Sequence, residues 1–385
     1  MIGHGFMGAA HSVGWRQAPA VFDLPVDVEM AVVVGRDAAG VAQAAQKWGW
    51  AESATDWREV IARDDIDVID VVTPGDLHAE IAIAALEAGK HVLCEKPLAN
   101  TVEEASQMLA AADAAAARGR IAMVGFTYRR VPAVTLMRDL IAQGRIGRVQ
   151  QVRAAYRQDW LVDPDAPLAW RLQREHAGSG ALGDIGAHII DMAQFVTGET
   201  IEAVSGTVET IVAERPLLAA GAGLSGVAGD GRGAVTVDDV AIFTGRLAGG
   251  ALASFEATRF ATGRKNSLTL EVSGDRGALA FDLEELNVLH HYDRTAPAEL
   301  QGFTKVLVTE PTHPYIGAWW PAGHMLGYEH GFVHQVVDLV TAIHDGSQPH
   351  PSFAEGLGVQ RVLAAVEQSA RDNSGWVRTA AYIPA

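Results

Sequence analysis

The chain has 385 residues, of which 49% are hydrophobic and 20% are charged, and its formal net charge is −17. This length exceeds what one core usually supports and the apolar fraction is typical of globular proteins, so we expect a folded protein of more than one domain. The acidic balance without a basic cluster argues against nucleic acid or a membrane surface as a partner, and the single cysteine, Cys94, excludes a disulfide framework and favours the cytoplasm.

Residues 1–125 alternate short strand-like runs with helical stretches. Runs rich in Val and Ile predict strands at residues 28–34, 67–73, 90–94 and 121–125. A helix is predicted at residues 78–88, with Gly89 as its left-handed cap, and Thr101 and Glu104 have the spacing of a capping box for a helix that ends at Gly119. This alternation predicts an α/β Rossmann domain with a doubly wound parallel sheet over residues 1–125.

Residues 126–385 have a different rhythm, in which strands follow one another closely. Helices are predicted at residues 132–143, 185–195, 328–344 and 353–372, and strands at residues 148–158, 202–212, 239–247, 268–273 and 278–283. The glycine-rich stretch 219–234 lacks apolar periodicity, and we interpret it as a mobile loop. We therefore expect an α+β domain over residues 126–385 with a large, mostly antiparallel open sheet, and its last helix (353–372) is a candidate to pack back on the first domain.

Gly3, Gly5 and Gly8 have the spacing of a dinucleotide-binding turn, with Phe6 and Met7 inside it. The first glycine permits the tight turn, the second lets a pyrophosphate approach the backbone, and the third lets the helix pack on the strand. Only Met1 and Ile2 precede Gly3, although the motif should follow a full strand. Either the first strand is truncated or the translated start lies upstream of Met1.

The end of the second strand decides which dinucleotide such a domain binds. An acidic residue that binds a ribose 2′-hydroxyl is expected near position 35, but the sequence there is Gly35-Arg36, followed by Asp37. A guanidinium at Arg36 permits a 2′-phosphate and is otherwise a solvated surface group. The sequence therefore leaves both NAD and NADP open.

Lys96 follows a predicted central strand directly, within Glu95-Lys96-Pro97. Ligands of open parallel sheets bind beyond the carboxyl ends of the strands, so a lysine at this place points into the ligand crevice. The chain contains only five lysines, which makes its retention here informative, although a solvated Glu–Lys surface pair is the alternative. Cys94, one residue before the triplet, is expected to pack beneath the cofactor site as a small apolar residue.

Asp184 and His188 stand four residues apart, so they share one face of a predicted helix. Gly180, Gly183 and Gly186 allow backbone or ligand to approach closely beside them. A carboxylate accepts a hydrogen bond from a sugar hydroxyl, and an imidazole of near-neutral pKa takes the proton that leaves it. The alternative is that Asp184 and His188 form a solvated pair on the helix surface. The presence of a candidate catalytic lysine, Lys96, makes this interpretation less favoured.

The chain resembles the Gfo/Idh/MocA oxidoreductases, a family that includes glucose–fructose oxidoreductase and inositol dehydrogenases. The resemblance covers almost the whole chain, and the joint order of its motifs is more specific than any one of them. The motifs that carry it are the glycine turn, Thr73-Pro74-Gly-Asp-Leu-His78, Glu95-Lys96-Pro97, Tyr128-Arg129-Arg130 and Gly183-Asp184-Ile-Gly-Ala-His188. A closer pattern, typical of the levoglucosan dehydrogenase-like branch, comprises Gln158-Asp-Trp160, Pro167-Leu-Ala-Trp170-Arg171 and Gly178-Ser-Gly-Ala-Leu-Gly183.

The resemblance implies a set of site residues. It implies that the catalytic residues are Lys96, His188 and Asp184. It implies a cofactor site made of Gly3, Gly5, Phe6, Met7, Gly8, Arg36, Thr73, Pro74, His78, Glu95, Lys96, Trp170 and Arg171. It implies a substrate site made of Lys96, Tyr128, Gln158, Trp160, Asp184 and His188.

The predicted function is an NAD(P)-dependent dehydrogenase that oxidises a hydroxyl of a sugar, anhydrosugar or cyclitol. His188 would accept the hydroxyl proton, Lys96 would hold the same oxygen, and Asp184 would orient the neighbouring hydroxyls. Two alternatives remain: a glycosidase that acts by transient oxidation with tightly held NAD, and a non-catalytic regulator that senses the cofactor.

The sequence also allows expectations about membrane, metal and subunit partners. We expect no membrane partner, because no apolar run approaches the roughly 18 residues of a membrane span and no charged-then-apolar leader is present. His330 and His334 stand four apart, but no Glu follows the first and no cysteine is near, so we expect no metal. An open sheet with one uncovered face predicts a homodimer or homotetramer.

Overall fold

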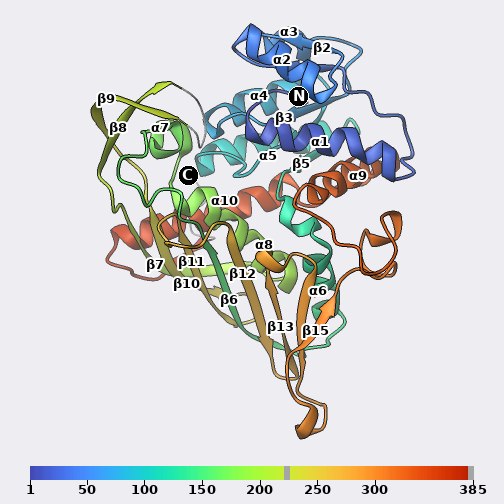
Figure 1. Cartoon of the computed structure of the whole chain (residues 1–385), viewed down its shortest axis with the longest axis vertical. Helices are drawn as coiled ribbons and strands as arrows, with labels where there is room; N and C mark the ends of the chain where they lie inside the picture. The colour runs from blue at the N-terminus through green and yellow to red at the C-terminus, as the bar shows by residue number, and fades with distance from the viewer. Residues whose placement is uncertain (221–225, 380–385) are drawn as a thin grey trace. The chain divides into compact units, whose positions relative to one another are not determined.

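The structure is a computed structural model that describes residues 1–220 and 226–379 (Figure 1). The chain divides into two compact units, of which the first joins Met1–Arg130 to Tyr328–Gln360 and the second joins Val131–Gly327 to Arg361–Ala385. The first break lies close to the predicted boundary after residue 125. The segment Tyr328–Gln360 was expected in the second domain, but it is part of the first unit, where its helix α9 (His330–Asp345) packs on helix α1 (Phe6–Val21) and on the turn Thr127–Arg130.

The first unit contains a parallel sheet built from five short strands. They are β1 (Val32–Val34), β2 (Glu52–Ala54), β3 (Val68–Val71), β4 (His91–Cys94) and β5 (Ala122–Val124). Pairing is parallel throughout, and β1, β4 and β5 are buried along their whole length, as expected of a sheet covered on both faces. Strands β1, β3, β4 and β5 lie inside the predicted runs but are shorter, whereas β2 was not predicted.

Ile2 takes the place of the first strand. It forms parallel bridges to Val34 on one side and Val71 on the other, so it joins β1–β2 to β3–β4–β5. The backbone N–H of Ile2 donates to Asp70 O (2.7 Å) and the N–H of Gly3 donates to Val34 O (2.9 Å). Ile2 therefore places the glycine turn at the centre of the sheet.

Helices surround this sheet. They are α1 (Phe6–Val21), α2 (Ala38–Trp48), α3 (Trp57–Ile61), α4 (His78–Glu87), α5 (Val102–Ala116), α9 (His330–Asp345) and the first part of α10 (Phe353–Arg371). The predicted capping box is present: Thr101 Oγ1 accepts from the N–H of Glu104 and the Glu104 side chain accepts from the N–H of Thr101. Gly14 lets α1 approach α9, since a Cβ there would lie 2.7 Å from Phe332 O.

The second unit contains a nine-stranded sheet in the order β15-β14-β13-β12-β6-β11-β10-β7-β16. Its strands are β6 (Val149–Arg157), β7 (Ile201–Glu209), β10 (Val240–Leu247), β11 (Leu252–Thr258), β12 (Ser267–Gly274), β13 (Gly277–Asp282), β14 (Val288–Asp293), β15 (Thr304–Leu307) and β16 (Val377–Arg378). Every pair is antiparallel except β6 with β11, which confirms the predicted sheet type. Strand β11 was missed by the sequence pattern.

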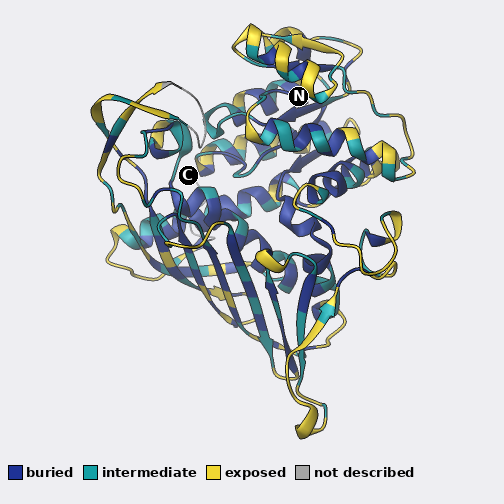
Figure 2. Ribbon diagram, viewed as in Figure 1, coloured by how far each residue is buried: buried dark blue, intermediate teal, exposed yellow. Residues whose placement is uncertain are grey.

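One face of this sheet is covered by helices and the other is more exposed (Figure 2). Helices α6 (Pro132–Ala142) and α8 (Ala187–Thr197) pack on the covered face, and α7 (Arg174–Ala177) is a single turn. Along β10 the residues alternate, with Phe243 buried and Ile242 exposed, as a half-covered antiparallel strand requires. The second unit is thus the predicted α+β domain with an open sheet.

The stretch interpreted as a mobile loop, residues 219–234, contains strand residues. Strands β8 (Glu214–Ala220) and β9 (Val227–Ala234) pair antiparallel, and residues 221–225 lie outside the described residues. The prediction was wrong for β9 because a β-ladder is held by backbone hydrogen bonds and does not need apolar side chains. Its glycines even permit close pairing, since a Cβ at Gly229 would lie 2.8 Å from Ala219 Cβ.

Among the described residues, no helix is both long and apolar enough to cross a bilayer.

Candidate active site

The glycine turn has the geometry of a pyrophosphate-binding turn. Gly3 has φ +109°, and a Cβ there would lie 2.6 Å from Val72 O. A Cβ at Gly8 would lie 2.8 Å from Gly3 O, so α1 can begin this close to the strand only without a side chain. A Cβ at Gly5 would meet no atom within 4 Å, so the surface above the N-terminus of α1 is open where phosphates bind. Phe6 and Met7 form the first turn of α1, which contains no acidic residue.

In the loop after β1, the one carboxylate is engaged as a helix cap. Asp37 caps α2, accepting hydrogen bonds from the N–H groups of Ala39 (3.3 Å) and Gly40 (2.9 Å). His4 fills the space beside Gly35, where a Cβ would lie 2.2 Å from His4 Nδ1. Arg36 is exposed. The side chains here therefore offer a guanidinium and an imidazole instead of the acidic residue that commonly binds the 2′-hydroxyl.

Lys96 lies two residues after the end of β4 and is half-buried, as the position of a crevice lysine requires. His78, at the start of α4, places both ring nitrogens 3.0 Å from backbone carbonyls, Nε2 from Thr73 O and Nδ1 from Pro97 O. Burial lowers the pKa of His78, and the carbonyl of Thr73 partly opposes this. His78 thus ties the Thr73-Pro74 loop to the Lys96 segment.

Glu95 is buried and is held at three points. Its N–H donates to Val71 O (2.9 Å), its Oε1 lies 2.9 Å from His11 Nε2, and its Oε2 accepts from the N–H of Lys96 (3.2 Å). The other imidazole nitrogen of His11 contacts Asp70. Sequence reasoning missed His11 and Asp70, although His11 follows the glycine turn by three residues and is the one histidine of α1.

Tyr128 is buried in the 3₁₀ turn Thr127–Arg130. Its ring centroid lies 6.4 Å from that of Tyr328, which in turn lies 5.3 Å from the ring of Phe332. Burial, followed by the influence of Tyr128 and Glu95, raises the pKa of Tyr328 far above its usual value. Tyr328 is therefore a neutral phenol beside Tyr128, the predicted substrate residue of this unit. The sequence analysis did not identify Tyr328.

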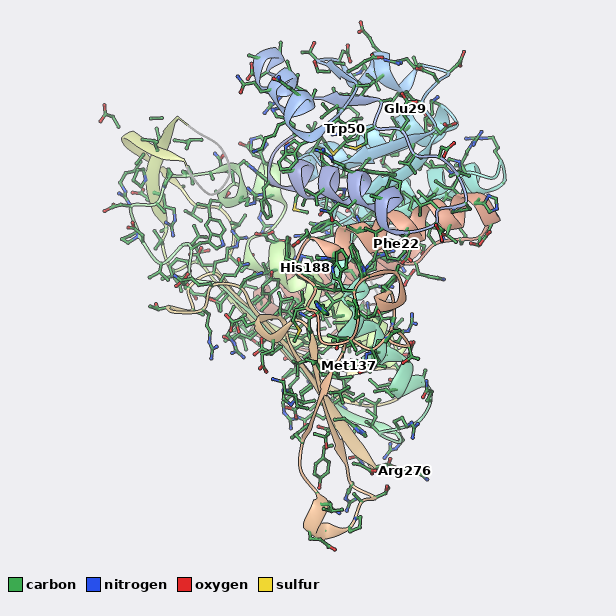
Figure 3. The ribbon with its side chains drawn as sticks, turned by 45° about the vertical axis from the view of Figure 1, so that its right-hand side comes forward. Phe22, Glu29, Trp50, Met137, His188 and Arg276 are labelled. Carbon is green, nitrogen blue, oxygen red and sulfur yellow. The ribbon has the colours of Figure 1, made fainter. Side chains whose placement is uncertain are left out.

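In the second unit, Asp184 and His188 lie around the start of α8, where Figure 3 labels His188. The helix does not begin as expected, because Leu182–Gly186 is a π-helical turn that precedes α8. Buried Asp238 supports this turn by accepting from the N–H groups of Gly180 and Leu182, both at 2.7 Å. A Cβ at Gly180 would lie 1.7 Å from Asp238 O, so the predicted close approach at this glycine is one of protein backbone.

Two arginines lie close to Asp184. The side chain of Arg259 is fully buried, with Nε 3.8 Å from Asp184 Oδ2 and Nη1 3.4 Å from Arg171 O. Burial lowers the pKa of Arg171, while Asp184 opposes this shift and Arg259 adds to it. The guanidinium of Arg171 also stacks 4.4 Å from the Trp170 ring. The sequence identified Arg171 and Trp170 but missed Arg259.

Gln158 and Trp160 are held in a hydrogen-bonded group. Trp160 Nε1 donates to Gln158 Oε1 (2.9 Å), and Gln158 Nε2 donates to Asn266 Oδ1 (2.8 Å). Tyr156 donates to the same oxygen of Asn266 (2.7 Å), and its ring centroid lies 5.8 Å from that of His188. The structure thus brings four predicted residues of the second unit, Gln158, Trp160, Asp184 and His188, into one neighbourhood linked by Tyr156 and Arg259.

Each unit therefore supplies half of the chemistry that was predicted. The first offers an ammonium at a strand end beside a phosphate-binding turn, and the second offers an imidazole, a carboxylate and hydrogen-bonding side chains suited to hydroxyl groups. The roles assigned to the individual residues, and the convergence of Lys96 and His188 on one alcohol, stay predictions.

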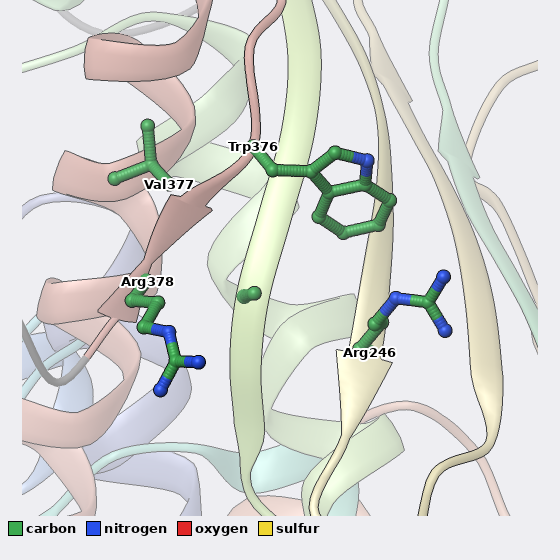
Figure 4. Close-up of a pocket in the computed structure, with 5 residues that line it drawn as sticks. Arg246, Trp376, Val377 and Arg378 are labelled. Atoms are coloured by element: carbon green, nitrogen blue, oxygen red, sulfur yellow. The ribbon is translucent and has the colours of Figure 1, made fainter.

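Other candidates contribute less. A surface hollow of the second unit is lined by Ala203, Arg246, Trp376, Val377 and Arg378 (Figure 4), and none of these is a predicted site residue. Buried His334 is held by Arg130 O (2.9 Å), and burial lowers its pKa to about 3. Within residues 1–220 and 226–379, no three His, Cys, Asp or Glu side chains are grouped to hold a metal ion.

The comparisons with known proteins cover both units. The family described as "Oxidoreductase family, NAD-binding Rossmann fold" matches residues 1–126, and the GFO/IDH/MocA C-terminal domain matches residues 134–280. Levoglucosan dehydrogenase of Pseudarthrobacter phenanthrenivorans is 42% identical over 382 residues, covering 98% of this chain and 96% of that protein. A levoglucosan dehydrogenase solved with NADH and levoglucosan is 41% identical with a TM-score of 0.92, covering 98% of each chain. The oxidoreductase domain protein from Kribbella flavida is 60% identical with a TM-score of 0.94, covering 98% of this chain and 97% of that one.

A parallel dinucleotide-binding sheet, a strand-end lysine and a second unit with an open antiparallel sheet define a two-domain nicotinamide-dependent oxidoreductase. The chain belongs to the Gfo/Idh/MocA family, as its motifs predicted. The predicted fold class, the assignment as an NAD(P)-dependent oxidoreductase of a sugar, anhydrosugar or cyclitol hydroxyl, and the nicotinamide cofactor are confirmed.

Proposed function

We propose that the chain oxidises a hydroxyl of levoglucosan, or of an anhydrosugar of similar shape, and prefers NAD to NADP. The observation that carries the proposal is the likeness over nearly the whole chain to a dehydrogenase solved with NADH and levoglucosan. The hydrogen-bonded group around Gln158, Trp160 and Asn266 supports it, because bicyclic sugars present an apolar face and several hydroxyls.

The proposed roles follow from what alcohol oxidation requires. The hydroxyl must lose a proton while the carbon loses a hydride, and NAD(P), when bound, accepts that hydride. His188 takes the hydroxyl proton, and the ammonium of Lys96 stabilises the negative charge that develops on the same oxygen. Asp184, beside Arg259, accepts from neighbouring hydroxyls, and Tyr128 completes the substrate site.

The proposed cofactor site combines the open turn with its neighbours. Pyrophosphate is bound by the backbone of Gly3, Gly5, Phe6, Met7 and Gly8 at the N-terminus of α1, where the helix dipole favours an anion. Thr73, Pro74, His78 and Glu95 shape the strand-end loops below the nicotinamide. Trp170 and Arg171 contact the cofactor from the second unit, and Arg36 lies at the adenosine ribose.

The test is a panel of anhydrosugars, sugars and cyclitols, each incubated with NAD or NADP, in which reduced nicotinamide is followed by its absorbance. We expect reduction with levoglucosan and NAD at a kcat/KM at least tenfold above that with NADP. Sugar release without net reduction would replace the dehydrogenase by the glycosidase alternative. Cofactor binding without turnover on any member of the panel would favour the alternative of a non-catalytic regulator that senses the cofactor.

Assembly and location are proposed on separate grounds. The exposed face of the second unit's sheet carries Ile242 and Leu252 on neighbouring strands, and burial of this face in a homodimer or homotetramer would remove them from water. A cytoplasmic location is supported by a chain with one cysteine, which is buried.

A further inference from the structure

The feature that the proposed chemistry leaves unused is a buried charged group beneath Lys96. The imidazole of His11 lies between two carboxylates, with Nδ1 2.9 Å from Asp70 Oδ2 and Nε2 2.9 Å from Glu95 Oε1. Trp15 Nε1 donates to the same oxygen of Asp70 (2.7 Å). The exposed fractions are 1% for His11, 2% for Asp70 and 4% for Glu95, so none of the three is solvated.

Three elements bring these groups together. His11 lies on the second turn of α1, Asp70 is on β3, and Glu95 follows β4, so the group lies on one side of the central strands of the parallel sheet. The ring of Phe332 covers the imidazole at a centroid distance of 5.4 Å. Gly125 leaves room for the carboxylate, since a Cβ there would lie 2.6 Å from Glu95 Oε1. The arrangement is built into the core of the first unit.

The hydrogen-bond pattern sets the charge of the imidazole. Ionised carboxylates only accept, so when both carboxyl groups are ionised both nitrogens of His11 donate and the ring is an imidazolium. Burial alone would lower the pKa of His11, but the charges and hydrogen bonds of Asp70 and Glu95 raise it to about 10. One positive and two negative groups leave one excess negative charge under the strand end.

This charge group is joined directly to Lys96. The second oxygen of Glu95 accepts from the N–H of Lys96 at 3.2 Å, so the carboxylate is fixed by His11 on one side and by the lysine backbone on the other. An uncompensated buried carboxylate would be costly, so the imidazolium stabilises Glu95 in the place where it accepts from the Lys96 backbone. The position of the Lys96 backbone thus depends on the group.

We propose that His11 is a positioning residue, which Asp70 holds as an imidazolium so that it fixes Glu95 and thereby places Lys96. The inference rests on the proposed role of Lys96 but concerns residues that the proposed function does not use. The other titratable groups under the influence of Asp70 or Glu95 are the amino group of Met1, Cys94, His78 and Tyr328.

The first experiment measures the protonation of His11 in the full, unmodified chain by ¹⁵N spectra of labelled histidine. The resonances of His11 are identified by their loss in His11→Gln, or by their shift in Asp70→Asn if the first variant does not fold. We expect two protonated ring nitrogens at about pH 8, well above the usual histidine pKa. A ring with one protonated nitrogen at this pH would overturn the proposal, whether or not the substrate has been identified.

The second experiment measures the consequence for Lys96 with Asp70→Asn, which keeps shape but removes a charge. We expect kcat to fall at least tenfold, while the dissociation constant for NAD changes less than twofold. The control is His334→Gln in the same unit, where the histidine is also buried and its Nδ1 lies 2.9 Å from Arg130 O. An unchanged kcat in Asp70→Asn would overturn the link to Lys96, whereas failure of the proposed function would appear as a wild-type chain without turnover.

Discussion

Lys96 is held in place by its two neighbours in the sequence. Glu95 accepts from its N–H, and His78 contacts the carbonyl of Pro97 on its other side. The sequence predicted Lys96, Asp184 and His188 because each stands in a short local motif. It could not predict His11, Asp70 or Arg259, since the contacts of His11 span 59 and 84 positions and pair elements whose register no local pattern reveals.

The first prediction concerns Lys96→Ala. Removal of the ammonium takes away the charge that stabilises the developing alkoxide, so we expect kcat to fall by about two orders of magnitude or more. NAD affinity, measured by titration of the apo-protein, should change little because the glycine turn supplies the phosphate contacts.

The control for this variant is Lys47→Ala, since Lys47 is an exposed residue of α2 in the same unit. It should retain the turnover of the unchanged chain. A Lys96→Ala enzyme as active as Lys47→Ala would remove Lys96 from the mechanism.

The second prediction concerns Arg259→Met. The buried guanidinium faces Asp184 and donates to Arg171 O, so replacing it alone with an apolar side chain removes one partner of an ion pair, and we expect the urea midpoint to fall. Asp184 would lose one of its two neighbouring cations, and we expect kcat/KM for the sugar to fall about tenfold.

Arg153→Met provides the comparison, because Arg153 forms an exposed ion pair with Glu271 on the same sheet. That change should alter neither stability nor kcat/KM appreciably. Equal losses of activity in the two variants would show that Arg259 has no special relation to the site.

At the scale of elements, helices with end signals were predicted well and short strands less so. Helix α5 begins at its capping box, and α4 is followed by Gly89 with φ +79°. Strand β9 was hidden by its glycines, and the π-helical turn before α8 has no sequence signature because it depends on Asp238, more than 50 residues away. Local patterns identify elements that are stabilised locally and miss those stabilised by distant partners.

The third prediction concerns Gly180→Ala, at the start of this turn. The added Cβ would lie 1.7 Å from Asp238 O, so backbone must move, and we expect the free energy of unfolding to fall by about 3 kcal/mol.

Gly358→Ala is the matched change, because a Cβ at Gly358 meets nothing within 4 Å and the residue lies inside α10. It should stabilise the chain by about 0.5–1 kcal/mol through helix propensity. Urea unfolding of both variants measures the difference, and a tolerated Gly180→Ala would mean that the turn is not as tightly built as its geometry implies.

For the whole molecule, the order of strands and helices predicted the two-unit organisation but not its composition. Tyr328–Gln360 returns to the first unit, where Val124 N–H donates to Pro351 O and Thr127 Oγ1 donates to Gln335 Oε1 (2.7 Å). Such a return joins residues about 200 positions apart, and only tertiary packing determines it.

The fourth prediction is a dependence of stability on pH. Burial lowers the pKa of His11 but its carboxylate partners raise it to about 10, above the value of 6.5 expected for the unfolded chain. The folded chain therefore binds this proton more tightly, and the stability it contributes is full below pH 6.5 and is lost as pH rises through about 10. Urea unfolding across this range should show a steeper decline for the unchanged chain than for Asp70→Asn, and parallel declines would contradict the imidazolium.

The fifth prediction concerns assembly. Ile242→Glu places a charge on the exposed face of the open sheet, and sedimentation should show an oligomer for the unchanged chain and dissociation for this variant. Glu202→Gln, a change at an exposed residue of β7, serves as the control. A monomer at micromolar concentration in the unchanged chain would end the proposal.

The buried position of Cys94 on β4 has a practical consequence. It is the single thiol of the sequence, and burial, with Glu95 and Asp70 nearby, raises its pKa well above 9.0, so maleimide reagents should leave the native protein unlabelled. A cysteine introduced at exposed Gln43 of α2 would then carry a fluorophore alone. Single-molecule spectroscopy of this enzyme can thus begin from its natural sequence, without first preparing a cysteine-free background.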